Sequence, residues 1–147
     1  MNGKLYNNLG ICSLSIALTL QHVDRLSLSR ALLIMPIIAH EELLQYMARK
    51  TTHFNSIEQL IVRKPECFLN FNARFYDGLT VSINAIQFLS ELALIKVESG
   101  DMISIETLNY EKSMGERAQK IFNASSRIAD FVGSDTANLY TNLRIEL

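Results

Sequence analysis

The fold is decided by the stretch "LTVSINAIQFLSELALIKVESGDMISIE", residues Leu79 to Glu106. Thr80 or Ser82 is expected to cap a helix that lasts to about Leu92 with apolar residues at helical spacing, and the period then changes. "ALIKVE" and "MISIE" are short strand-like runs, and the "SGD" between them is typical of a hairpin turn. We therefore expect a helix followed by a small β-hairpin, which is the closing half of a winged helix.

The segments on either side are predicted to be helical. "NNLG" (Asn7–Gly10) has the chemistry of a turn, and an apolar helix follows it to about Val23. Pro36 interrupts the second apolar segment, so we expect a kink or two abutting helices there. Near the C-terminus, apolar residues at helical spacing predict a long helix from about Gly115 to Val132, followed by a last helix capped by Ser134 or Asp135.

The predicted fold class is mainly α, a winged-helix-like domain with a β-hairpin wing and flanking N- and C-terminal helices. We expect residues 1–147 to form a single domain. Within it, residues 1–54 are the N-terminal helices, residues 55–108 the winged-helix-like core and residues 109–147 a C-terminal helical extension.

The composition argues against a dedicated nucleic-acid binder. The chain has 147 residues, with 14 basic and 15 acidic side chains and a net charge of −1. Phosphate contacts need a basic excess, and none is present. Cys12 and Cys67 lie far apart in apolar company and are expected to be buried, reduced thiols, which suits a cytoplasmic protein. The apolar run Ile11–Leu20 is too short to span a membrane and lacks an export signal's cleavage pattern.

The predicted helix after Leu79 has one apolar and one polar face. Its apolar positions, expected to be buried, are Val81, Ala85, Phe88, Leu89 and Leu92. The opposite stripe, Thr80, Asn84, Gln87 and Glu91, contains no cation, and Glu98, Asp101 and Glu106 surround Lys96 on the wing. A structural module or a protein-binding surface is therefore favoured over DNA reading, although Asn84 and Gln87 have the groups to contact adenine.

The sequence contains no recognised catalytic or phosphate-binding motif. "HEELL" (His40–Leu44) begins like a zinc-protease helix but has Leu44 where the second histidine belongs, so His40 is more simply a helix-surface or capping residue. His22 and His53 are distant in sequence. We predict no catalytic, cofactor-binding or metal-binding residues, and an enzyme hidden in the helical region is the least favoured reading.

Three groups of residues are candidates for contact with a protein partner. They are the stripe Thr80, Asn84, Gln87 and Glu91, the N-terminal Tyr6, Asn7 and Asn8, and Arg74 with its aromatic neighbours. Each has a structural alternative: a solvated helix face for the stripe, a helix cap for Asn8, and core packing for the aromatic neighbours of Arg74.

Several segments in order resemble a known family. They are "YNNLGICSLSIAL" (Tyr6–Leu18), "LSRALLIMPIIAHEELLQYM" (Leu28–Met47), "NSIEQLIVRKPECFLNFNARFYD" (Asn55–Asp77), "LTVSINAIQFLSELALI" and the terminal "KIFNASSRIADFVGSDTANLYTNLRIEL". The chain resembles the small middle component of three-component ABC systems, the class that includes Lamassu-type bacterial defence operons. Its asparagine pair, the Pro36–His40 spacing and the closing Leu143-Arg144 match that family's pattern.

The resemblance implies a non-catalytic adaptor without a cofactor. Its partners would be an SMC-like ABC ATPase that senses aberrant DNA and an effector, often a nuclease, that the complex holds inactive until activation. Contact with DNA would be indirect, through the complex. The alternative is a small winged-helix transcription regulator that binds DNA itself.

Overall fold

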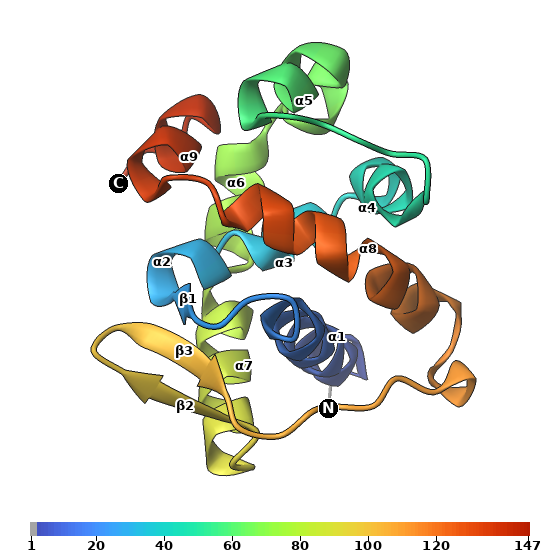
Figure 1. Ribbon diagram of the computed structural model, residues 1–147, viewed down its shortest axis with the longest axis vertical. Coiled ribbons are helices and arrows are strands. Elements are labelled where there is room, and N and C mark those ends of the chain that lie inside the picture. The colour runs from blue at the N-terminus through green and yellow to red at the C-terminus, as the bar shows by residue number, and fades with distance from the viewer. Residues whose placement is uncertain (1–2) are drawn as a thin grey trace.

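The computed structural model describes the backbone of residues 3–147 and the side chains of residues 8–147 (Figure 1). Helices dominate, and the short strands form one small antiparallel sheet. The elements of the first half are α1 (Gly3–Leu20), β1 (Leu26–Ser27), α2 (Leu28–Ala31), α3 (Ile34–Ile38), α4 (Glu41–Ala48), α5 (Ile57–Arg63), η1 (Pro65–Cys67) and α6 (Phe71–Asp77). Those of the second half are α7 (Leu79–Glu91), β2 (Ile95–Glu98), β3 (Asp101–Ser104), η2 (Lys112–Met114), α8 (Glu116–Val132) and α9 (Thr136–Asn142). The predicted mainly α class with a β-hairpin is confirmed.

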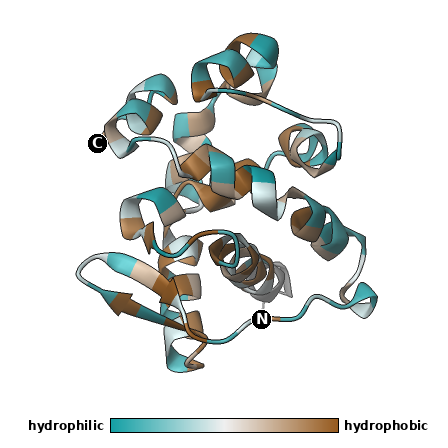
Figure 2. Ribbon diagram, viewed as in Figure 1, coloured by the Kyte–Doolittle hydropathy of each residue, from teal (hydrophilic) through white to brown (hydrophobic). Residues whose placement is uncertain are grey.

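Helix α1 runs through the centre of the molecule. It packs against α7 on one side and α8 on another, and every residue from Cys12 to Leu20 is buried. Figure 2 shows it as hydrophobic over most of its coloured length. A helix that is apolar on all sides must be enclosed by other elements. Helices α3, α7 and α8 therefore enclose α1, and amphipathic α8 presents its apolar stripe to both α1 and α4.

Pro36 lies in a broken helical segment, as expected. The chain from Leu28 to Ala48 forms three short helices, α2, α3 and α4, instead of one long helix. All residues of α3 are buried, Pro36 included. Proline has no N–H for a helical ladder, and Pro36 is the third residue of α3, where backbone N–H groups have no partner within the helix. The breaks let the apolar run turn within the core.

The hairpin turn after α7 is built from two residues. Strands β2 and β3 pair antiparallel, with Glu98 opposite Asp101, and Ser99 and Gly100 between them both have positive φ angles of 54° and 80°. Two such residues are typical of a type I′ turn, whose twist matches that of the strands. The third strand, β1, pairs with β3 and comes from the segment predicted to be entirely helical. At two residues it is too short to leave a pattern in the sequence.

Two predicted helix starts are wrong. Helix α1 already includes the "NNLG" stretch, so Asn8 lies inside the helix and does not cap it. Helix α7 begins directly after Gly78, and neither Thr80 nor Ser82 caps it. In both places a helix-favouring tertiary environment outweighs the turn and cap preferences of Asn, Gly, Ser and Thr. The predicted cap of the last helix is confirmed, because Asp135 accepts a hydrogen bond from the Asn138 backbone N–H at 3.1 Å.

One hydrophobic core draws on all three predicted segments. It includes Ile16 from residues 1–54, Phe71 from residues 55–108 and Phe131 from residues 109–147. Phe68 stacks between Phe71 and Phe131, with ring centroids 6.2 Å and 6.1 Å away. In the described part of the chain, every helix is too short or too polar to cross a bilayer.

Candidate partner-binding site

The outward stripe of α7 is exposed as predicted. Thr80, Asn84, Gln87 and Glu91 all face solvent, and Gln87 donates a hydrogen bond to the Glu91 carboxylate at 3.2 Å. The buried positions of the helix are Ser82, Ala85 and Leu89. The stripe therefore presents amide, hydroxyl and carboxylate groups and no cation.

A pocket of mixed lining, which we call the polar pocket for its Asn, Arg, Asp and Thr side chains, brings together residues from all three candidate groups. It has a volume of about 340 Å³, and Asn8, Arg74, Thr80 and Asn84 are among the residues that line it. Met35 and Val81 contribute apolar walls, and Asp77 places a carboxylate at its edge. Gln87 and Glu91 continue the stripe beyond the pocket. The side chains of Tyr6 and Asn7 lie outside the described residues. Asn8 and Asn84, 76 positions apart in sequence, thus share one surface because α1 packs on α7.

Arg74 is committed mainly to holding the fold. Its Nε donates to the carbonyl of Pro36 at 3.2 Å, Nη1 to that of Leu69 at 2.9 Å and Nη2 to that of Cys67 at 2.8 Å. The guanidinium also lies over the ring of Phe71, 5.2 Å from its centroid. Burial lowers the pKa of Arg74. These contacts join α6 to α3 and to the chain from Cys67 to Leu69 that precedes α6. Arg74 is thus part of the pocket wall, and most of its own N–H donors are already occupied.

The wing carries paired charges. Arg25 contacts Asp101 at 3.2 Å, and Lys96 contacts Glu98 at 3.1 Å. Each cation of this surface thus has a carboxylate beside it. A surface of this kind releases few counterions from a phosphate backbone, which weakens the case for DNA binding by the hairpin.

An apolar groove lies where the sequence predicted core. Phe88 and Leu92 were expected to be buried, but 40% and 52% of their surface is exposed. They line a groove of about 610 Å³ whose other walls include Ile11 and Leu14 of α1 and Leu108 and Met114 of the segment before α8. The sequence contains evidence for this exposed apolar surface, because α7 has apolar residues over a wider arc than one buried stripe requires. The additional apolar residues indicate a second apolar face.

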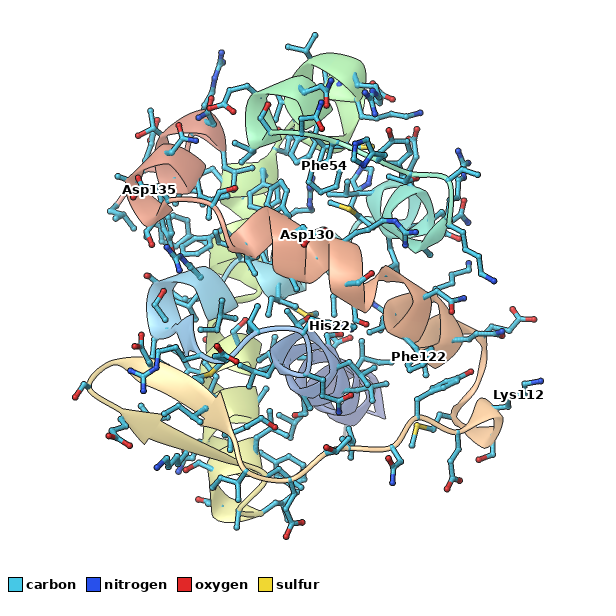
Figure 3. The ribbon with its side chains drawn as sticks, viewed as in Figure 1. His22, Phe54, Lys112, Phe122, Asp130 and Asp135 are labelled. Atoms are coloured by element: carbon cyan, nitrogen blue, oxygen red, sulfur yellow. The ribbon has the colours of Figure 1, made fainter. Side chains whose placement is uncertain are left out.

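The segment that closes the groove is held by an aromatic pair. Tyr110 stacks on Phe122 of α8, with ring centroids 4.5 Å apart and an interplanar angle of 16°. Figure 3 labels Phe122 on the part of α8 nearest this segment. Gln21 at the end of α1 also donates to the carbonyl of Leu108 at 2.9 Å. These contacts fix the position of the segment that contains Leu108 and Met114 relative to α1 and α8.

The three histidines have separate structural contacts. His22, labelled in Figure 3, contacts the Ser125 hydroxyl of α8 at 3.0 Å, and His53 contacts the side chain of Asn55 at 3.1 Å. His40 caps α4, which confirms the simpler of its two readings. The described residues bring together Glu42, Glu66 and Cys67 with their ligand atoms within 4.8 Å. Burial and the neighbouring carboxylates raise the pKa of Cys67, so the thiolate that a metal requires is disfavoured there.

Both cysteines are buried and unbridged, as predicted. Cys12 faces α7, where its Sγ lies 4.0 Å from the Ser82 hydroxyl. Burial raises the pKa of Cys12 to about 11, with the Ser82 contact acting in the opposite direction. A thiol of this kind is a packing group and a poor nucleophile.

The geometry thus combines a polar pocket beside the N-terminal half of α7 with an apolar groove beside its C-terminal half. Comparison with known families places this arrangement in context. No curated protein and no solved structure is similar enough to the chain to count as a match. A family model, described as ABC-three component (ABC-3C) system Middle Component 3, matches residues 7–147. Because that match covers nearly the whole chain, the protein belongs to the Middle Component 3 family of ABC-three component systems.

Proposed function

We propose that this protein is a non-catalytic adaptor of a bacterial defence complex against phage and plasmids. It bridges an SMC-like ABC ATPase and an effector nuclease, and it helps to hold the effector inactive until aberrant DNA is sensed. It acts in the cytoplasm as one domain and meets DNA only through the complex. The observation that carries the proposal is membership of a middle-component family, since a component of a multi-protein system must bind its neighbours.

The distribution of exposed apolar side chains supports a bridging role. One cluster, which we call the α7 end, consists of Phe88, Leu92 and Met114. Two further apolar side chains, Val62 of α5 and Leu69, which we together call the α5 end, are exposed by 80% and 65%. Helix α5 and the C-terminal half of α7 lie at opposite ends of the molecule's long axis (Figure 1). Exposed apolar patches mark interaction sites, and two separated patches suit a protein with two partners.

The same surface favours the adaptor over a DNA-binding regulator. A recognition helix needs cations or bidentate amide groups at its outward face, above all arginine for guanine. The α7 stripe offers Asn84 and Gln87 but ends in Glu91, and Gln87 is already bonded to that carboxylate. The paired charges of the wing add no attraction for phosphate. Partner proteins, by contrast, use mixed polar and apolar surfaces.

The test is co-purification from the native gene neighbourhood. Tagged protein is expressed together with the ATPase and effector subunits encoded beside it, and the complex is isolated by affinity and size-exclusion steps. We expect both neighbours to be retained at defined stoichiometry. Recovery of the chain alone contradicts the adaptor role. A parallel gel-shift titration at low salt distinguishes the alternative, because salt-sensitive binding of a duplex by the isolated protein would support a regulator.

A further inference from the structure

The groove at the α7 end has an unusual combination of walls. Its floor is the buried Leu89, its rim consists of Phe88, Leu92 and Met114, and Arg117 lies at the start of α8. Among the described residues that line the groove, Arg117 is the charged one. The volume of about 610 Å³ falls within the roughly 300–1,000 Å³ of ligand-binding pockets. The groove therefore has room for several apolar side chains and has one cation at its edge.

We propose that this groove binds an amphipathic helix of a partner subunit, whose apolar residues fill it and whose carboxylate pairs with Arg117. The inference rests on the proposed adaptor function and specifies one of its two docking surfaces. The bound helix presents two or three large apolar residues spaced three or four positions apart, with an aspartate or glutamate at the flank nearest α8.

The walls select a helix rather than an extended strand. The groove lies between α1, α7 and the first turn of α8, with Leu94 and Leu108 lining it from non-helical chain. The carbonyls of Leu94 and Leu108 already accept hydrogen bonds, from the Ile105 N–H and from the Gln21 side chain. A bound strand gains affinity from main-chain hydrogen bonds to an open sheet edge, and these walls offer side chains instead. A helix satisfies its own backbone and needs only an apolar surface. The apolar lining from Ile11 to Met114 supplies such a surface.

The charge at the groove's edge selects an acidic residue. Arg117 is exposed and has no ion pair or side-chain hydrogen bond within the described part of the chain. Glu116 is the acidic residue in the first turn of α8, but the N-cap Gly115 provides no side chain to accept from the first N–H groups, so these donors can still attract a bound carboxylate. A carboxylate placed there would be held by Arg117 and by the helix dipole together. An uncharged lipid or hydrocarbon has no group that could pair with Arg117 or with the N-terminus of α8.

The experiment uses the full chain co-expressed with its neighbouring ATPase and effector subunits. Two variants change the groove, Leu92→Lys and Arg117→Glu. The matched control is Ile83→Lys, because Ile83 lies on the same helix and is 53% exposed, against 52% for Leu92. Ile83 and Phe88 are five positions apart on the helix, which places them about 140° apart around the axis. The control thus adds the same charge outside the groove.

We expect each groove variant to lower the affinity for one partner by about tenfold or more, while the other partner and the folded state are retained. Ile83→Lys should bind both partners as the unaltered chain does. The effect of Arg117→Glu should diminish as salt is raised, since exposed charges are screened. A photo-crosslinking residue in place of Met114 should join the chain to a helical peptide that has the apolar spacing and the carboxylate described above.

Several outcomes overturn the inference. If both groove variants keep both partners at full affinity, the groove is not the docking site although the adaptor role stands. A crosslink from position 114 to a second copy of the chain, or to a segment without helical apolar spacing, excludes the proposed occupant. If the unaltered chain retains neither partner, the adaptor function fails and the groove proposal fails with it.

Discussion

The Nδ1 atom of His40 accepts a hydrogen bond from the backbone N–H of Leu43 at 3.1 Å and so caps helix α4. An acceptor at Nδ1 is unprotonated, which places the proton of the neutral ring on Nε2. Desolvation, followed by the positive charge of Arg74, lowers the pKa of His40 below the ordinary histidine value of 6.5. The neutral ring is therefore part of the folded structure.

His40→Ala is expected to destabilise the protein by about 1 kcal/mol at pH 8, because an N–H of the first turn loses its acceptor. His40→Asn is the control, since asparagine is a good N-cap and should restore most of the loss. Urea unfolding followed by circular dichroism measures both. A loss of equal size in the two variants would show that the ring packs rather than caps.

The same cap predicts a dependence on pH. Because the folded pKa of His40 lies below 6.5, the unfolded chain binds the proton more readily, and stability falls as pH decreases through and below that value. His40→Asn does not titrate in this range. Its free energy of unfolding should therefore vary less between pH 8 and pH 5 than that of the unaltered chain. If the free energy of unfolding changes equally with pH in the two proteins, His40 is not the group responsible for the pH dependence.

The parts of the fold that local rules govern were predictable from the sequence. The hairpin follows from an alternating pattern around Ser99-Gly100, and the breaks near Pro36 follow from a missing N–H. Strand β1 was not predictable, because two residues carry no period and its pairing with β3 depends on how α1 and α7 pack. The predicted starts of α1 and α7 were wrong for the same reason, because tertiary packing outweighed the local preferences of Asn8 and Thr80.

For the candidate site, the sequence identified residues but not their arrangement. Asn8, Arg74 and Asn84 were chosen as members of separate groups, and only the packing of α1 and α6 on α7 places them around one pocket. Phe88 and Leu92 were wrongly predicted to be buried, because the same helical period is produced by one broad apolar face and by two separate apolar faces. Which apolar residues of the helix are buried depends on elements that are far away in the chain.

Cys12 predicts a loss of stability at alkaline pH. Burial raises its pKa from 9.0 to about 11, so the folded state retains the thiol proton over a range in which the unfolded chain releases it. The stabilisation is complete below pH 9 and is lost as pH rises toward 11, with a magnitude of order 2 kcal/mol. Cys12→Ala should be less stable at pH 8 but show a shallower decline above pH 9. Guanidinium unfolding at pH 8 and pH 10.5 makes the comparison, and equal declines would refute it.

Arg74→Lys is expected to destabilise the protein although it conserves the charge. Lysine offers one nitrogen where the guanidinium donates to three carbonyls, those of Pro36, Cys67 and Leu69. We expect a cost of about 2 kcal/mol, since buried acceptors lose charged donors. Arg49→Lys is the matched control on an exposed arginine and should change the free energy of unfolding by less than about 0.5 kcal/mol. A tolerated Arg74→Lys would mean that water replaces the lost bonds.

The polar pocket is tested by Asn84→Arg. Asn84 is exposed, so the longer side chain should leave stability within about 0.5 kcal/mol of the original. It would fill the opening between Asn8 and Thr80 and add a charge beside Arg74. If the pocket contacts a partner, affinity in the co-purified complex should fall about tenfold. Ser90→Arg adds the same group to an exposed position of α7 outside the pocket and should leave affinity unchanged. If both variants lower the affinity for the partner equally, the cause is the change in net charge. If Asn84→Arg keeps full affinity, the pocket does not contact a partner and this face of α7 is solvated surface.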